Sequence, residues 1–118
     1  MRISYVAFSG DRDSLTARRV LAPAPVREIE VKALSVQGLL DRRRITKIDL
    51  LQIDTQGFDC PIVKQFLSSK VRPAAIHFEH FHTPEDDFRE CLRLLVDNGY
   101  RFASLEIDTV AYLQEKAR

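Results

Sequence analysis

The chain has 118 residues, of which 45% are hydrophobic and 30% are charged, and its formal net charge is +1. These values predict one soluble domain with a small core and exclude a large basic surface for nucleic acid. Two cysteines cannot build a disulfide framework, no apolar run is long enough to span a membrane, and the first residues lack the apolar core of a signal peptide. We therefore expect a cytoplasmic protein that binds neither nucleic acid nor membrane.

Residues 1–25 are predicted to be an irregular lead-in to an α/β core over residues 26–118, the whole chain forming a single domain. A short strand is expected over residues 5–8 and a brief helix from Ser14 to Val20. The segment Ala22-Pro-Ala-Pro25 then stops the helix, because the residue before a proline disfavours helical backbone.

From Arg27, apolar and charged residues alternate, which is typical of a strand with one face on the core. Ser35 is placed to cap a short helix whose Leu39 and Leu40 face inward. The basic run over residues 42–44 suits the solvated end of that helix, because positive charge complements the helix dipole there.

The segment from Ile48 to Ile53 is a nearly continuous apolar run, which predicts a strand buried on both faces, as in a parallel sheet between helix layers. The run stops at Asp54, and Gly57 supplies the backbone freedom that a tight turn needs. Asp59 is placed to cap a new helix, with Pro61 tolerated in its first turn.

The next helix is predicted from Cys60 to about Ser69, and a second apolar strand follows from Ala74 to Glu79. A helix between two strands is a crossover connection, so the strands are predicted to be parallel. Asp54 and Glu79 would then lie at the same edge of the sheet, where ligands bind in open α/β sheets.

A third helix is predicted to begin with Thr83 as its cap and Pro84 in its first position, and to end at Asn98-Gly99. Strands are expected from Tyr100 to Ile107 and from Val110 to Leu113, antiparallel because no helix fits between them. Cys60 and the helix stripe are expected to be packing residues; the stripe comprises Phe88, Cys91, Leu92, Leu95 and Val96.

Several of these segments carry motifs in a fixed order. Residues 31–40 read VKALSVQGLL, residues 48–59 read IDLLQIDTQGFD, and shorter motifs follow at residues 75–80, 98–100 and 108–112. The first two resemble the patterns V-x-x-L-[TS]-x-D-x-L-L and [IV]-D-[LF]-L-[KQ]-I-D-x-E-G-[YA]-[DE] of the FkbM-type S-adenosylmethionine-dependent methyltransferases. The shorter ones resemble that family's second acidic strand tip, the opening of its late strand and its closing segment.

The resemblance implies a partial Rossmann-like methyltransferase fold, with parallel central strands and an antiparallel terminal pair. It also implies methyl transfer from S-adenosylmethionine, which we expect to reach a hydroxyl oxygen of a small molecule or glycan. Asp54, Thr55 and Gln56 are the expected cofactor contacts, and Asp54, Glu79 and His80 the expected catalytic residues, with no metal. His80 is the better base, because an ordinary imidazole takes up a proton near neutral pH.

The chain departs from the family in two ways. Gln56 stands where the family usually has glutamate, and the glycine-rich cofactor loop is absent, since all four glycines are isolated. The chain thus resembles the second half of the domain, and the central strand is expected to leave an apolar edge open. We therefore expect a homo-oligomer, or a partner that supplies the missing amino-terminal half.

Two alternatives remain open at this point. One is a non-catalytic α/β module that binds a partner along the open edge, and the other is a fragment of a metal-dependent hydrolase. The metal ligands in the second case would be Asp54, Glu79, His80 and His82. His77 is expected to point into a helix layer, and packing is the expected use of Phe78, Phe81 and Phe88, ahead of an acceptor pocket.

Overall fold

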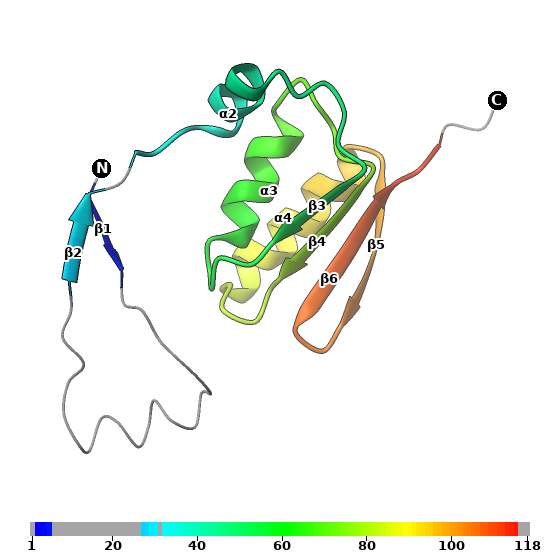
Figure 1. Ribbon diagram of the computed structural model, residues 1–118. Helices are drawn as coiled ribbons and strands as arrows, with labels where there is room; N and C mark the ends of the chain where they lie inside the picture. The colour runs from blue at the N-terminus through cyan, green and yellow to red at the C-terminus, as the bar shows by residue number, and fades with distance from the viewer. Residues whose placement is uncertain (1, 6–26, 31, 116–118) are drawn as a thin grey trace, which may run out of the picture. The chain divides into compact units, whose positions relative to one another are not determined.

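The computed structural model describes residues 2–5, 27–30 and 32–115, and the chain divides into two compact units, Met1–Ala33 and Leu34–Arg118. In the first unit, strand β1 (Arg2–Tyr5) pairs antiparallel with strand β2 (Arg27–Glu30) (Figure 1). Residues 6–8, the expected helix from residue 14 to residue 20 and the connector over residues 22–25 lie outside the described residues. The single domain with a boundary near residue 25 stays a prediction.

The second unit contains a four-stranded mixed sheet in the order β3-β4-β6-β5, with helices α3 and α4 packed on one face (Figure 1). The strands β3 and β4 are parallel, whereas β4 pairs antiparallel with β6 and β6 antiparallel with β5. This arrangement confirms the predicted α/β class, the parallel crossover and the antiparallel terminal pair. The elements are α2 (Val36–Arg43), β3 (Leu50–Ile53), α3 (Asp59–Leu67), β4 (Ala75–Glu79), α4 (Glu85–Asp97), β5 (Tyr100–Leu105) and β6 (Asp108–Leu113).

The core lies between the sheet and the two helices. Ile76 and Phe78 of β4 are fully buried, as are Val63 of α3 and Leu95 of α4. A strand places successive side chains on opposite faces, so Ile76 and Phe78 pack on the helices while His77 lies on the outer face. The prediction that His77 points into a helix layer is therefore wrong, and its Nε2 lies 3.6 Å from Asp108 Oδ1.

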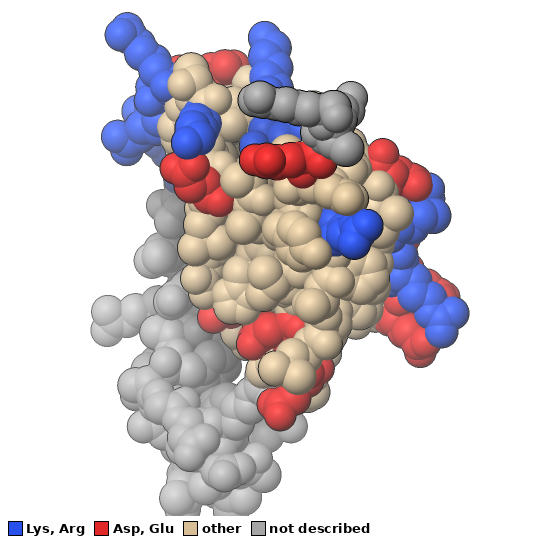
Figure 2. Space-filling model, turned by 90° about the vertical axis from the view of Figure 1, so that its right-hand side faces the viewer, with Lys and Arg blue, Asp and Glu red and all other residues tan. Residues whose placement is uncertain are grey.

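The strand predicted from Ile48 to Ile53 is not buried on both faces in the described part of the unit, so this prediction is also wrong. Leu50 is 60% exposed, whereas Ile53 is buried. The reason is that β3 forms the edge of the sheet and α3 covers only its inner face. On the outer face, Val110 and Tyr112 of β6 are exposed as well. Figure 2 faces the side on which β5 and β6 lie and shows a broad uncharged area, with charged side chains mainly toward its borders.

The start of α2 follows the sequence signal, but one leucine of α2 and the start of α4 differ from the prediction. Ser35 Oγ accepts the N–H of Gly38, as predicted for the cap of α2. Leu40 is buried, but Leu39 is exposed, so only one of the two leucines faces inward. Thr83 does not cap α4, because Pro84, predicted in the first helical position, occupies the cap position and the helix begins at Glu85.

The stripe of α4 also differs at one position. Cys91 and Leu95 are buried as expected, but Val96 is 54% exposed and the half-buried Leu94 packs against the core in its place. Gly99 has φ 87°, which confirms the left-handed end of the helix. None of the helices in the described residues is long and apolar enough to cross a lipid bilayer.

Candidate active site

The carboxyl ends of β3 and β4 meet at one edge of the sheet. Ile53 pairs with Phe78, so Asp54 and Glu79 follow at neighbouring positions, as predicted. The side-chain amide of Gln56 joins them: its Nε2 donates to Asp54 Oδ1 at 2.6 Å and to Glu79 Oε2 at 3.3 Å. A neutral donor therefore links two carboxylates at the position where the predicted catalytic residues meet.

The turn after β3 has an unusual backbone. Gln56 has φ 56°, in the left-handed region that non-glycine residues adopt rarely, and Gly57 has φ 121°. A Cβ atom on Gly57 would lie 3.4 Å from the Cβ of His82, so this turn is in close contact with the loop after β4. The backbone strain at Gln56 is offset by the two hydrogen bonds that its side chain makes.

Asp59, the first residue of α3, connects the ends of the two strands at this edge. It is fully buried, and its Oδ1 accepts the N–H and the hydroxyl of Thr55, while its Oδ2 accepts the N–H of Glu79 at 3.0 Å. Asp59 was expected to cap α3, but Phe58 occupies the cap position and makes no side-chain cap bond. The buried carboxylate instead fixes both strand ends, a role that sequence alone does not show, because one of its donors is 20 residues away.

His80 is engaged at both ring nitrogens. Its Nε2 lies 3.1 Å from the carbonyl oxygen of Glu106, and its Nδ1 lies 2.9 Å from Thr109 Oγ1. A carbonyl oxygen only accepts, so Nε2 carries a proton in this contact. The ring also stacks on Phe88 with centroids 4.4 Å apart. These contacts tie His80 to the β5–β6 hairpin, and its predicted role as a base stays a prediction.

A different histidine lies beside the acidic strand tip. His82 Nε2 is 3.5 Å from Glu79 Oε1, and the Glu79 side chain is only 11% exposed. From the sequence, His82 was considered only as a metal ligand in the hydrolase alternative, although its spacing of three residues from Glu79 is the signal that places the two side chains together. The geometry therefore offers a carboxylate–imidazole pair for proton transfer at the edge.

The two cysteines are packed in the hydrophobic core, as predicted. Cys60 and Cys91 are both fully buried free thiols. A hydrogen bond from one thiol to the other lowers the pKa of Cys60 and raises the pKa of Cys91, and burial opposes the ionisation of both. Reactive cysteines are partly exposed, so burial accounts for both residues as core side chains.

The residues at the edge fit S-adenosylmethionine in part. The carboxylates of Asp54 and Glu79 suit the positive charge of a sulfonium ion. Thr55, however, donates both its N–H and its hydroxyl to Asp59, so these groups are directed inward. Among the described residues, no group of three or more histidine, cysteine, aspartate or glutamate side chains is arranged to hold a metal ion.

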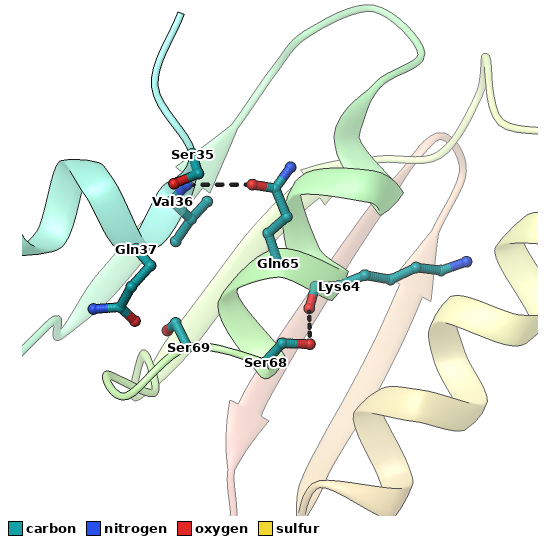
Figure 3. Close-up of a pocket in the computed structure, with 7 residues that line it drawn as sticks. All are labelled: Ser35, Val36, Gln37, Lys64, Gln65, Ser68 and Ser69. Atoms are coloured by element: carbon teal, nitrogen blue, oxygen red, sulfur yellow. Dashed lines mark hydrogen bonds between the residues drawn. The ribbon is translucent and has the colours of Figure 1, made fainter.

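Two hollows lined by described residues lie elsewhere. One, of about 320 Å³, lies where the start of α2 meets the end of α3 (Figure 3). There Gln65 Oε1 accepts the N–H of Val36 at 3.2 Å, and the Ser68 hydroxyl donates to the Lys64 carbonyl. The other, of about 480 Å³, lies beside Gly99 at the start of β5. Neither is lined by the strand-tip residues.

Comparison with protein families shows that residues 1–102 match the methyltransferase FkbM domain. Comparison with curated proteins and with solved structures gives no match. The family match covers most of the chain and includes both strand tips, the turn between Asp54 and Asp59, and helix α4. The chain therefore belongs to the FkbM methyltransferase domain family.

Proposed function

We propose that the chain forms the acceptor side of a methyltransferase that moves a methyl group from S-adenosylmethionine to a hydroxyl oxygen of a small molecule or glycan. The observation that carries this proposal is the Gln56 bridge between Asp54 and Glu79 at the carboxyl edge of a sheet in an FkbM domain. In open α/β sheets this edge is where ligands bind. S-adenosylmethionine supplies an electrophilic methyl group on a sulfonium ion.

The chain's own residues orient the acceptor and remove its proton. The exposed carboxylate of Asp54 is placed to accept a hydrogen bond from the acceptor hydroxyl. The proton leaves the hydroxyl as the oxygen is methylated, and Glu79 with His82 beside it takes up that proton. His80 acts as a positioning residue, because its ring holds the loop after Glu79 against the β5–β6 hairpin.

A second polypeptide segment completes the cofactor site in this proposal. The four glycines, Gly10, Gly38, Gly57 and Gly99, do not form the Gly-x-Gly run that lets backbone approach such a cofactor closely. The edge strand β3 offers a place for that segment, which residues outside this sequence must supply, because a second copy has the same isolated glycines. The buried free thiols of Cys60 and Cys91 suit the reducing cytoplasmic setting that we propose.

The second candidate function is a non-catalytic interaction module derived from a methyltransferase. It is favoured by the edge position of β3 and by the exposed apolar side chains on the outer face, Leu50, Val110 and Tyr112. Such surfaces recruit partners whether or not a reaction follows.

Labelled methyl transfer distinguishes the two candidates. The chain, alone and at concentrations where it associates, is incubated with methyl-labelled S-adenosylmethionine and a panel of hydroxylated acceptors. We expect product from the unmodified chain, loss of at least about a hundred-fold in turnover for Asp54→Asn, and no change for Asp49→Asn, an exposed aspartate before β3 that pairs with Lys47. Equal turnover of Asp54→Asn and the unmodified chain would refute the proposed site, and no product from any acceptor favours the interaction module.

A further inference from the structure

Two large aromatic side chains are exposed on adjoining loops at the strand tips. Phe58 is 58% exposed and Phe81 is 55% exposed. A single exposed aromatic residue needs no explanation, but these two lie on loops that contact each other. The contact is made by the residues next to them in the chain: a Cβ atom on Gly57, which precedes Phe58, would lie 3.4 Å from the Cβ of His82, which follows Phe81.

Both aromatic residues lie in hydrogen-bonded turns, since the N–H of Thr83 donates to the His80 carbonyl across Phe81. The N–H of Phe58 donates to Thr55 Oγ1 at 3.2 Å, which places Phe58 directly before α3. The ring of Phe81 meets the ring of His82 edge-on, with centroids 5.0 Å apart and planes at 81°. An aromatic side chain has only two side-chain torsions, so it loses little conformational entropy when a ligand packs on it.

The charge around the two rings restricts the ligand. The adjoining loops, residues 54–58 and 79–84, contain the carboxylates of Asp54 and Glu79, the imidazoles of His80 and His82, and no lysine or arginine. A phosphorylated or carboxylated ligand would be repelled there. Ligand hydroxyls, in contrast, can donate to the carboxylates and exchange hydrogen bonds with the Gln56 amide.

We propose that Phe58 and Phe81 are the acceptor-binding side chains of this edge and that they select an uncharged, polyhydroxylated ring. Such a ring has an apolar C–H face, which packs on aromatic side chains, and a rim of hydroxyls for the neighbouring polar groups. This inference rests on the proposed methyltransferase function and adds to it the two residues that recognise the acceptor.

The test is a saturation-transfer NMR titration of the full chain with methyl β-glucoside, glucose 6-phosphate and adenosine. We expect contacts to the ring C–H protons of the glucoside and weaker binding of the phosphate. In the double variant Phe58→Leu/Phe81→Leu, affinity for the glucoside should fall about five- to ten-fold. Leucine keeps apolar volume at both positions, and Phe102→Leu, at a residue on β5 that is 38% exposed, is the matched control.

Three outcomes would overturn the inference. They are undetectable binding of the glucoside to the unmodified chain, equal binding to the double variant, and loss of adenosine but not glucoside contacts in that variant. The last outcome would assign the two rings to the cofactor. A separate NMR titration of the double variant with S-adenosylmethionine distinguishes this inference from the proposed function. If only the assignment of the acceptor residues is wrong, the cofactor still shifts the resonances of Asp54 in the double variant.

Discussion

The carboxylate of Asp59 accepts the backbone N–H of Glu79 at 3.0 Å, although the two residues lie 20 positions apart in the chain. Because Asp59 also accepts two hydrogen bonds from Thr55, one buried side chain fixes the ends of both β3 and β4. The spacing between Asp54 and Glu79 at the candidate site thus depends on a residue that does not itself reach the edge.

Replacing Asp59 should unfold the site and weaken the whole domain. Asp59→Ala leaves the part-buried N–H groups of Thr55 and Glu79 without their acceptor and opens a cavity at a fully buried side chain, which should lower the free energy of unfolding by about 3 kcal/mol. Asp59→Asn keeps one acceptor oxygen and should cost about 2 kcal/mol. Urea unfolding measures both, with Asp41→Asn as an exposed control that should change stability by less than about 0.5 kcal/mol. A change of similar size in Asp59→Ala and the control would contradict the anchoring role.

Replacing Gln56 by the family's usual glutamate should destabilise this chain. Gln56→Glu removes the amide that donates to Asp54 and Glu79 and adds a third carboxylate. We expect a loss of about 1 kcal/mol at pH 7, kept small because the edge is solvated. The loss should shrink as the pH falls, since protonation of one carboxylate removes the repulsion.

Thermal unfolding at pH 7 and pH 4.5 measures this difference. Gln65→Glu is the matched control, because its side-chain oxygen still accepts the N–H of Val36. A Gln56→Glu variant as stable as the unmodified chain at pH 7 would show that the amide bridge contributes nothing.

The buried phenol of Tyr100 should give the domain an alkaline limit. Its hydroxyl donates to the Pro73 carbonyl at 2.6 Å, and burial raises the pKa of Tyr100. Tyr100→Phe should cost about 1–2 kcal/mol at pH 7, because the buried carbonyl loses its donor. A pKa raised in the folded state means that this stabilisation is complete below about pH 10 and is lost as the pH rises through the folded-state pKa.

The difference in unfolding free energy between the unmodified chain and Tyr100→Phe should therefore narrow from pH 9 to pH 11. Tyr112→Phe, at an exposed tyrosine on β6, is the control. A difference that stays constant or widens over this range would contradict the assignment.

The edge strand β3 should mediate association of the chain. Leu50 is 60% exposed on this strand, and a charged side chain there discourages edge pairing. In sedimentation experiments, the unmodified chain should associate as its concentration rises, and Leu50→Lys should weaken association about ten-fold. Leu105→Lys, at a residue 78% exposed on the opposite edge strand, should leave association unchanged. A monomer at every concentration, with a cooperative melt, would contradict this proposal.

Much of the fold follows from local patterns in the sequence. The crossover between β3 and β4 places Asp54 beside Glu79, and both could be predicted from an apolar run, a turn and an amphipathic helix. Element ends were set by local signals as well: Ser35 and Gly99 occupy the positions that their chemistry favours.

The predictions that failed concern what lies across the sheet or far along the chain. Whether Leu50 and His77 are buried depends on the covering of the outer face, which hydrophobic pattern alone does not show. The catalytic role of His80 stays a prediction, but the contacts of its ring with Glu106 and Thr109 could not be foreseen, because these residues are 26 and 29 positions away. Such tertiary contacts determine whether a ring nitrogen of a histidine beside an acidic strand tip is available to take up a proton.

The central claim is that the edge formed by Asp54, Gln56 and Glu79 meets a sulfonium cofactor and its acceptor. The most direct test is a titration of the isotope-labelled chain with S-adenosylmethionine, followed by residue-resolved NMR, with uncharged S-adenosylhomocysteine for comparison. We predict shifts at residues 54–57 and 79–82, weak affinity of roughly 0.1–1 mM because no glycine-rich loop is present, and weaker binding of the uncharged compound. Shifts confined to the hollow between α2 and α3, or none at millimolar cofactor, would contradict the account.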